Sequence, residues 1–305
     1  MRCNDEWKAA LAAIAAPVGI IFSSGQGMVF FFTQTGWTSW LGIALAAVLF
    51  GFFCGMICRI GLLTASQSLT KAYERLFSSG GTIAIRVLHG AFSAAVVLYM
   101  CSICGRVAAI AVPLHNAFLM GCAASGALAL LLNMKKQKRM SWMGLAVVVV
   151  CGVICTGMAM DPREVTIYQC YEVESKLFGS IGAAVLLAIL FAAVCILTSA
   201  MNLFCFAGYA RSGGRVAWKC GALMLIVLAP ANAALMRGGE KLFAQKQPMV
   251  LLAARWGRSG FYICAAMMWI CAVSTLAAVL ATVFDVWQVK SPKSAENMTK
   301  NSVKL

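Results

Sequence analysis

The sequence predicts an all-α polytopic membrane protein. Of its 305 residues, 62% are hydrophobic and 11% are charged, whereas soluble domains carry about 25% charged residues. The mean hydropathy of the chain is +0.85. The apolar residues form long runs that short polar segments separate, and a helix needs about 20 apolar residues to cross a bilayer. By that rule we expect about eight transmembrane helices, all within one integral membrane domain that covers residues 1–305.

The first apolar run, Trp7–Thr33, is long enough to cross a bilayer but has small and polar residues at its centre. It follows an acidic pair, Asp5 and Glu6, and lacks a small-residue cleavage site, so we interpret it as a span and not as a signal peptide. Small residues and a glutamine at membrane depth are tolerated where the backbone lines a protein-walled cavity. We therefore expect Phe22–Gly27 to be unwound, as in the broken helices that mark the binding sites of transporters.

Seven further spans follow the first one. The sixth apolar run of the chain has about 34 residues, or roughly 50 Å as one straight helix, so it must tilt, protrude or break in a hydrocarbon core of about 30 Å. The stretch Pro248–Ala254 is too short to span, and we expect it to form a helix near the outer face. The seven predicted spans are Thr38–Leu62, Thr82–Val112, Leu114–Met134, Met140–Met160, Leu177–Ala210, Arg215–Met236 and Ser259–Val286.

The positive charges predict the orientation of the chain. The net charge is +15, and most Lys and Arg residues lie in segments that share one side of the membrane if both termini are inside. Cytoplasmic loops carry such an excess. We therefore expect a multi-pass protein of a bacterial plasma membrane with cytoplasmic N- and C-termini. Because no basic patch with interleaved aromatic residues is present, we do not expect a nucleic-acid partner.

The composition of the spans excludes several kinds of chemistry. No acidic residue and no Lys lies mid-span, since Asp285 and Lys219 stand at the inner ends of the eighth and seventh predicted spans. This pattern argues against a carboxylate-based proton pump and a divalent-metal transporter. We expect Arg86, His89 and Arg106, which flank the third span, to extend toward the membrane surfaces. His89 and His115 are not expected to meet, so we predict no metal site between them. No nucleophile–base pair or phosphate-binding glycine loop occurs, and we predict no enzyme activity and no cofactor other than a sodium ion.

Most of the 14 cysteines lie in apolar runs. Cys101 and Cys104 have C-x-x-C spacing, but no second pair and no nearby carboxylate completes a metal site. We interpret these thiols as packing residues.

The first two spans carry a motif. It is Ile21-Phe22-Ser23-Ser24-Gly25-Gln26-Gly27, followed by Phe30-Phe31-Phe32, Gly36 and Trp40-Leu41-Gly42-Ile43. Together with Gln247–Ala253, this pattern resembles the YkvI-type membrane proteins of the amino acid–polyamine–organocation transporter superfamily. The resemblance implies the LeuT-type fold of two inverted five-helix repeats and transport of an amino-acid-like solute.

The chain departs from that family in three places. The family's Glu after Gln is Gly27 here, the sixth span lacks an evident glycine break, and the helices nine and ten of the family have no counterpart. The resemblance therefore implies a truncated, five-plus-three repeat. Residues 7–160 would form the first repeat, 177–286 a partial second repeat and 287–305 a cytoplasmic tail.

The resemblance also implies where a solute would bind. Ser23, Ser24, Gly25, Gln26 and Gly27 would expose backbone N–H groups to a solute carboxylate; the alternative is a packing notch of small residues between helices. Three residues of one helical face, Thr198, Ser199 and Asn202, would form the opposite wall, or would only make interhelical hydrogen bonds.

Two adjacent hydroxyls, Ser274 and Thr275, lie inside the eighth span. In sodium-coupled relatives such a pair joins first-helix carbonyls around the ion, and here the carbonyl candidates are Gly19 and Phe22. Oxygen ligands suit a hard cation. The alternative is that the hydroxyls bond back to the preceding turn of their own helix.

Two functions follow from these patterns. The first is a cation-coupled secondary transporter that moves a small amino-acid-like solute by alternating access. The second is a non-transporting membrane scaffold that keeps the fold but acts through a partner, either a second copy of the chain in a homodimer or another membrane protein.

Overall fold

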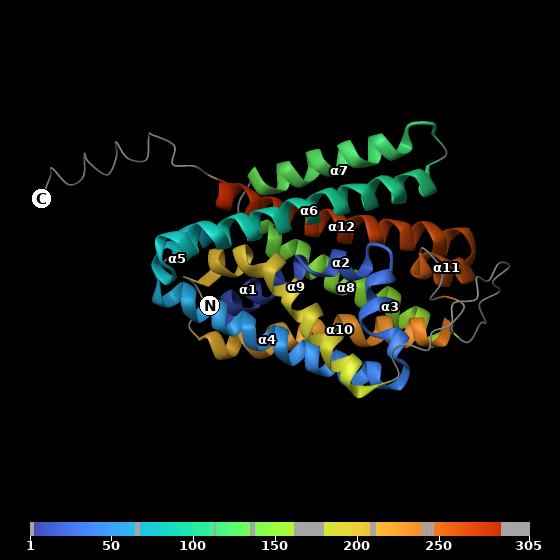
Figure 1. The fold of residues 1–305 in the computed structure, drawn as a ribbon. Helices are drawn as coiled ribbons and strands as arrows, with labels where there is room; N and C mark the ends of the chain where they lie inside the picture. Colours follow the sequence, from blue (N-terminus) through green and yellow to red (C-terminus); the bar gives the residue numbers. More distant parts are fainter. Residues whose placement is uncertain are drawn as a thin grey trace, which may run out of the picture.

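The protein is described here from a computed structural model. It describes residues 3–64, 68–112, 114–134, 138–161, 180–207, 212–238, 242 and 247–287. Over these ranges the chain is α-helical with short turns, and most helices run in the same or opposite directions (Figure 1). The predicted all-α, polytopic fold is confirmed. The predicted tail and most of the acidic loop after the fifth span lie outside the described residues.

The first predicted span is broken into three short helices. These are α1 (Cys3–Ala15), α2 (Val18–Phe22) and α3 (Gln26–Phe31), and a 3-10 helix, η1 (Thr33–Thr38), leads on to the second span. The other long helices are α4 (Ser39–Leu63), α6 (Ser79–Ala111), α7 (Ala117–Met134), α8 (Lys138–Met160), α9 (Ile181–Ala207), α10 (Gly213–Gly238) and α12 (Gly257–Trp287). Short helices α5 (Leu69–Leu76), α11 (Pro248–Ala253) and η3 (Ala254–Trp256) lie between them.

Each of the eight predicted spans coincides with helix in the structure. Six described helices are long and apolar enough to cross a membrane, and α7 has a shorter apolar stretch. The break within the first span is confirmed. Within the long sixth run, the described residues 181–207 form one continuous helix of 27 residues, α9, without a break.

One helix was missed by the sequence analysis. The polar loop expected after the second span contains α5, and Ser68 caps its start: the Ser68 side chain accepts a hydrogen bond from the Lys71 N–H. Its Leu69 is buried beside Val286 of α12. Burial raises the pKa of the Tyr73 phenol to about 12, with a contribution from Asp285, and its Oη lies 2.7 Å from Nδ1 of His89.

Small residues let the long helices approach one another closely. At the contact of α4 with α10, a Cβ on Gly51 would lie 2.5 Å from the carbonyl oxygen of Ala217. Close backbone approach of this kind is how helices pack in membranes, where lipid is as apolar as the side chains. Helix α12 packs against α6 and α7 and also against α1, α2, α8 and α9, and α7 lies at the edge of the bundle (Figure 1).

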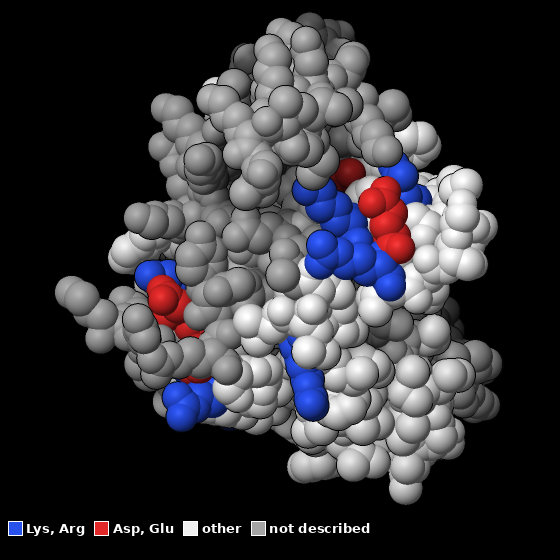
Figure 2. All heavy atoms as spheres, turned by 90° about the vertical axis from the view of Figure 1, so that its left-hand side faces the viewer, with Lys and Arg blue, Asp and Glu red and all other residues white. Residues whose placement is uncertain are grey.

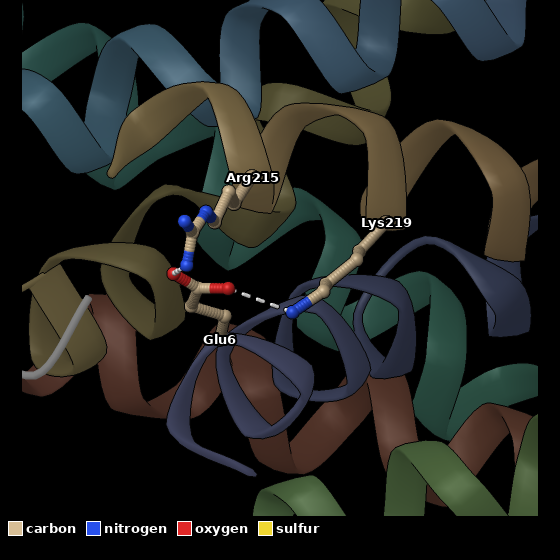
Figure 3. Close-up of polar contacts among 3 residues, drawn as sticks. All are labelled: Glu6, Arg215 and Lys219. Atoms are coloured by element: carbon tan, nitrogen blue, oxygen red, sulfur yellow. Dashed lines mark hydrogen bonds and ion pairs between the residues drawn. The ribbon is translucent and has the colours of Figure 1, made fainter. Parts of the chain in front are cut away.

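Charged side chains gather at one end of the bundle. Figure 2 faces this end, where α4 and α12 terminate and α1, α6 and α10 begin. A buried ion pair joins two of these helices: Lys219 Nζ of α10 lies 2.7 Å from Glu6 Oε2 of α1, and each side chain is 3% exposed. Arg215 lies 4.0 Å from the other carboxylate oxygen but is 67% exposed (Figure 3). The pair holds the start of α1 against α10.

Lys219 corrects one statement made from the sequence. We placed it at the polar inner end of the seventh span, but it lies inside α10 and is buried. Its ammonium group also lies 5.1 Å from the ring centre of Trp7.

Candidate solute site at the broken first helix

The first break is caused by Pro17. A proline has no N–H, so it cannot donate the helical hydrogen bond to the carbonyl four residues earlier, that of Ala13. Two side chains of α9 replace the lost donors at the end of α1. Ser199 Oγ donates to the Ala13 carbonyl at 2.8 Å, and Asn202 Nδ2 donates to the Ala12 carbonyl at 3.2 Å.

Two hydroxyls of α12 form hydrogen bonds with further backbone groups at this break. Ser274 Oγ donates to the Ala15 carbonyl at 2.8 Å, and Thr275 Oγ1 donates to the Ala16 carbonyl. The Gly19 N–H donates to Thr275 Oγ1 at 2.9 Å. Because an unsatisfied backbone group costs several kcal/mol inside a bilayer, these side chains make the broken helix tolerable at membrane depth.

The carbonyls beside the hydroxyl pair are not the ones that the sequence predicted, those of Gly19 and Phe22. The hydroxyl pair does lie against the first helix, but beside the carbonyls of Ala15 and Ala16. The Gly19 carbonyl instead accepts the Ser23 N–H at 2.9 Å. Successive residues of a helix point about 100° apart around its axis. The sequence alone therefore does not show which carbonyls of the first helix face α12.

The second break, Ser23–Gly25, separates α2 from α3. Gly25 has φ +78°, a left-handed conformation that favours glycine, and a Cβ there would lie 2.6 Å from Met249 Cγ of α11. Helix α11 therefore packs directly against the break. The Ser24 hydroxyl accepts the Gln26 N–H at 3.2 Å, which starts α3.

A cavity of about 290 Å³ lies beside the second break. The Ser23 side chain is 1% exposed, and among the described residues its Oγ has no hydrogen-bond partner. A buried hydroxyl without a partner is costly, and here it is at the wall of a cavity. The lining residues are Ser23, Ser24, Gln26, Tyr99, Ile103, Arg106 and Gln247.

Part of the predicted solute site therefore lines this cavity. Gly25 and Gly27 shape the backbone instead: a Cβ on Gly27 would lie 2.6 Å from the carbonyl oxygen of Ile20, so α3 packs tightly on α2. The predicted opposite wall lies elsewhere. Thr198 donates to the carbonyls of Val194 and Cys195 in its own helix.

The wall that faces the break comes from α6. Tyr99, Ile103 and Arg106 recur at intervals of four and three residues, so they share one face of that helix. Arg106 was expected to extend toward the membrane surface; it is exposed and also lines the cavity. Its spacing from Tyr99 places both residues on one face of α6, but the sequence does not show which helix that face meets.

The lining groups determine which solutes the cavity suits. Arg106 is the charged residue among them, and the others supply hydroxyls, amides and one apolar side chain. A guanidinium group binds carboxylates through paired, charge-assisted hydrogen bonds. Within the described ranges, no group of three His, Cys, Asp or Glu residues could hold a metal ion.

Comparison with known proteins supports the fold. No family model matches the chain, and no curated protein matches it. Among solved structures, a mutant of the manganese transporter of Eremococcus coleocola matches 94% of this chain and 67% of its own, with a TM-score of 0.63 and 12% sequence identity. The chain has a transporter fold of the LeuT type. At this identity the likeness shows the fold alone, and the resemblance to the YkvI family stays a prediction.

Proposed function

We propose that the protein is a secondary transporter that binds a small, carboxylate-bearing, amino-acid-like solute beside the second break of its first helix. The observation that carries the proposal is the unpartnered hydroxyl of Ser23 in a cavity that it shares with Arg106. Helices broken at mid-membrane mark the binding sites of many secondary transporters. The transporter fold supports the same class of function.

The charge of the cavity favours this cargo over a metal cation. The structurally similar protein is a manganese transporter, and manganese prefers carboxylate, carbonyl and water ligands. A guanidinium at the cavity wall repels a dication and attracts a carboxylate. Gln26 and Gln247 carry amide oxygens that could accept hydrogen bonds from a solute amine.

A coupling cation would be held at the first break. The oxygens of Ser274 and Thr275 meet the carbonyl oxygens of Ala15 and Ala16 within hydrogen-bonding distance. Such a set of neutral oxygens fits a hard monovalent cation such as sodium. On binding, the ion would take the place of the hydroxyl protons between these oxygens, and each hydroxyl would turn its proton elsewhere.

Uptake by proteoliposomes tests the proposal. The full chain is reconstituted and supplied with radiolabelled neutral and acidic amino acids, with and without a sodium gradient. We expect uptake of one solute class, and its loss on Gln26→Ala or Ser24→Ala with membrane insertion unchanged. Thr198→Val is the matched control, because that hydroxyl bonds only within α9. Unchanged uptake by both cavity variants would refute the site.

The second candidate, a non-transporting scaffold, is favoured by one observation. At the first break, side chains pair with the Gly19 N–H and with four carbonyls, those of Ala12, Ala13, Ala15 and Ala16. This arrangement also suits a static helix. A scaffold would show no uptake of any solute and would purify as a stable homodimer or with a fixed membrane partner.

A further inference from the structure

A groove runs along the outer surface between the end of α4 and the start of α10. Its volume is about 500 Å³, and it lies at the charged end of the molecule. The small residues at the start of α10 leave it open on one side. Its lining residues are Phe52, Gly55, Met56, Arg59, Leu62, Leu63, Ser212, Gly213, Gly214 and Ala217.

The groove wall on α4 is apolar and exposed. Phe52 is 57% exposed, Met56 44% and Leu63 79%. With Arg59 they stand at intervals of four, three and four residues, which places them on one face of the helix. On a helix long enough to cross a membrane, such a face meets lipid acyl chains.

Arg59 lies near the end of this face, with Leu63 one helical turn beyond it. It lies four residues before the last residue of α4, about 6 Å along the helix axis, which is near the membrane surface. Its side chain is exposed, and within the described part of the chain no ion pair to it is formed. The predicted orientation places this end in the cytoplasmic leaflet, where anionic lipids attract basic side chains.

We propose that the groove binds an anionic phospholipid, with the lipid phosphate on the Arg59 guanidinium and one acyl chain along Met56 and Phe52, which lie on the side of Arg59 toward the middle of α4. A guanidinium binds phosphate oxygens through two parallel hydrogen bonds. Arg59 is the charged residue among the described lining residues, so a free phosphate ion would contact that charge and leave the apolar wall empty. A phospholipid supplies an anion for Arg59 and an acyl chain for the apolar wall on α4, so it matches both parts of the groove.

Thermal shift and native mass spectrometry of the delipidated full chain in detergent test this inference, with phosphatidylglycerol and phosphatidylcholine as probes. We expect phosphatidylglycerol to raise the melting temperature and to stay bound in the gas phase, with phosphatidylcholine weaker. Arg59→Gln should weaken phosphatidylglycerol binding about fivefold, the effect of one interfacial basic residue, and Arg59→Lys should restore most of it. Lys71→Gln removes the same charge from α5, outside the groove, and should leave binding unchanged.

Three results would overturn the inference. Equal binding of the two lipids would show that the groove recognises only acyl chains. Equal protection by glycerol phosphate alone would identify a soluble anion as the occupant. Loss of lipid binding in Lys71→Gln to the same extent as in Arg59→Gln would show that general surface charge is responsible. Because none of these measurements uses an amino-acid solute, they stand apart from the test of transport.

Discussion

Replacing Lys219 with Met tests what holds the first helix against α10. The lysine ammonium lies 2.7 Å from the Glu6 carboxylate, and both side chains are 3% exposed. Met is close to Lys in size but carries no charge, so the variant leaves the carboxylate buried beside an apolar side chain. Arg215, at 4.0 Å and 67% exposed, can compensate only in part.

The expected cost follows from that burial. Removing one partner of a buried ion pair costs about 3–5 kcal/mol, and loss of the ammonium from the face of Trp7 adds about 1 kcal/mol. Arg215→Gln should cost less than about 1 kcal/mol, because exposed ion pairs contribute little. The double variant Glu6→Leu with Lys219→Met should recover most of the loss, since two apolar side chains of similar volume replace a buried pair at little cost.

Reversible unfolding in mixed detergent micelles measures these differences. Trp7 and Trp218, whose ring centres are 5.8 Å apart, provide a fluorescence signal beside the ion pair. The reasoning is refuted if Lys219→Met and Arg215→Gln lower the free energy of unfolding equally, or if the double variant is less stable than Lys219→Met alone.

Two further predictions concern the breaks in the first helix. Ser199→Ala leaves the buried carbonyl of Ala13 without its donor and should cost about 1–3 kcal/mol, whereas Thr198→Val should cost less than about 1 kcal/mol; equal costs in unfolding experiments would contradict the assigned roles. Gly25→Ala forces a side chain into a left-handed conformation and toward Met249, at about 1–3 kcal/mol of strain. A melting temperature equal to that of the unmodified protein would show that this backbone conformation is wrong.

The sequence predicted best those features that depend on short stretches of the chain. Long apolar runs give spans, and a Pro or a cluster of Ser, Gly and Gln inside such a run has a direct local effect on the helix. The break at Ser23–Gly25 was predicted for this reason, whereas the break at Pro17 was not predicted, although a proline inside an apolar run indicates one. Helix α5 was missed because eight residues of mixed polarity resemble a loop, and only the cap at Ser68 indicates a start.

The tertiary contacts were harder to predict. Glu6 and Lys219 stand 213 positions apart, each near the end of an apolar run, where a charge usually meets water. The rotation of α9 about its axis decides whether Ser199 faces a solute or the end of α1, and the weak periodicity of a span that is apolar on all sides does not determine that rotation. For the same reason Arg106 was not linked to the cavity.

The most direct test of the proposed solute site is ligand binding by the purified chain. A thermal-shift screen against amino acids and their decarboxylated or amidated analogues, with and without sodium, measures it because a ligand of the folded state raises the melting temperature. We predict a shift with one carboxylate-bearing class, none with the matched amide, and its loss in Arg106→Gln and Ser23→Ala. A cooperative transition that no solute shifts, or a shift that both variants retain, would contradict the account.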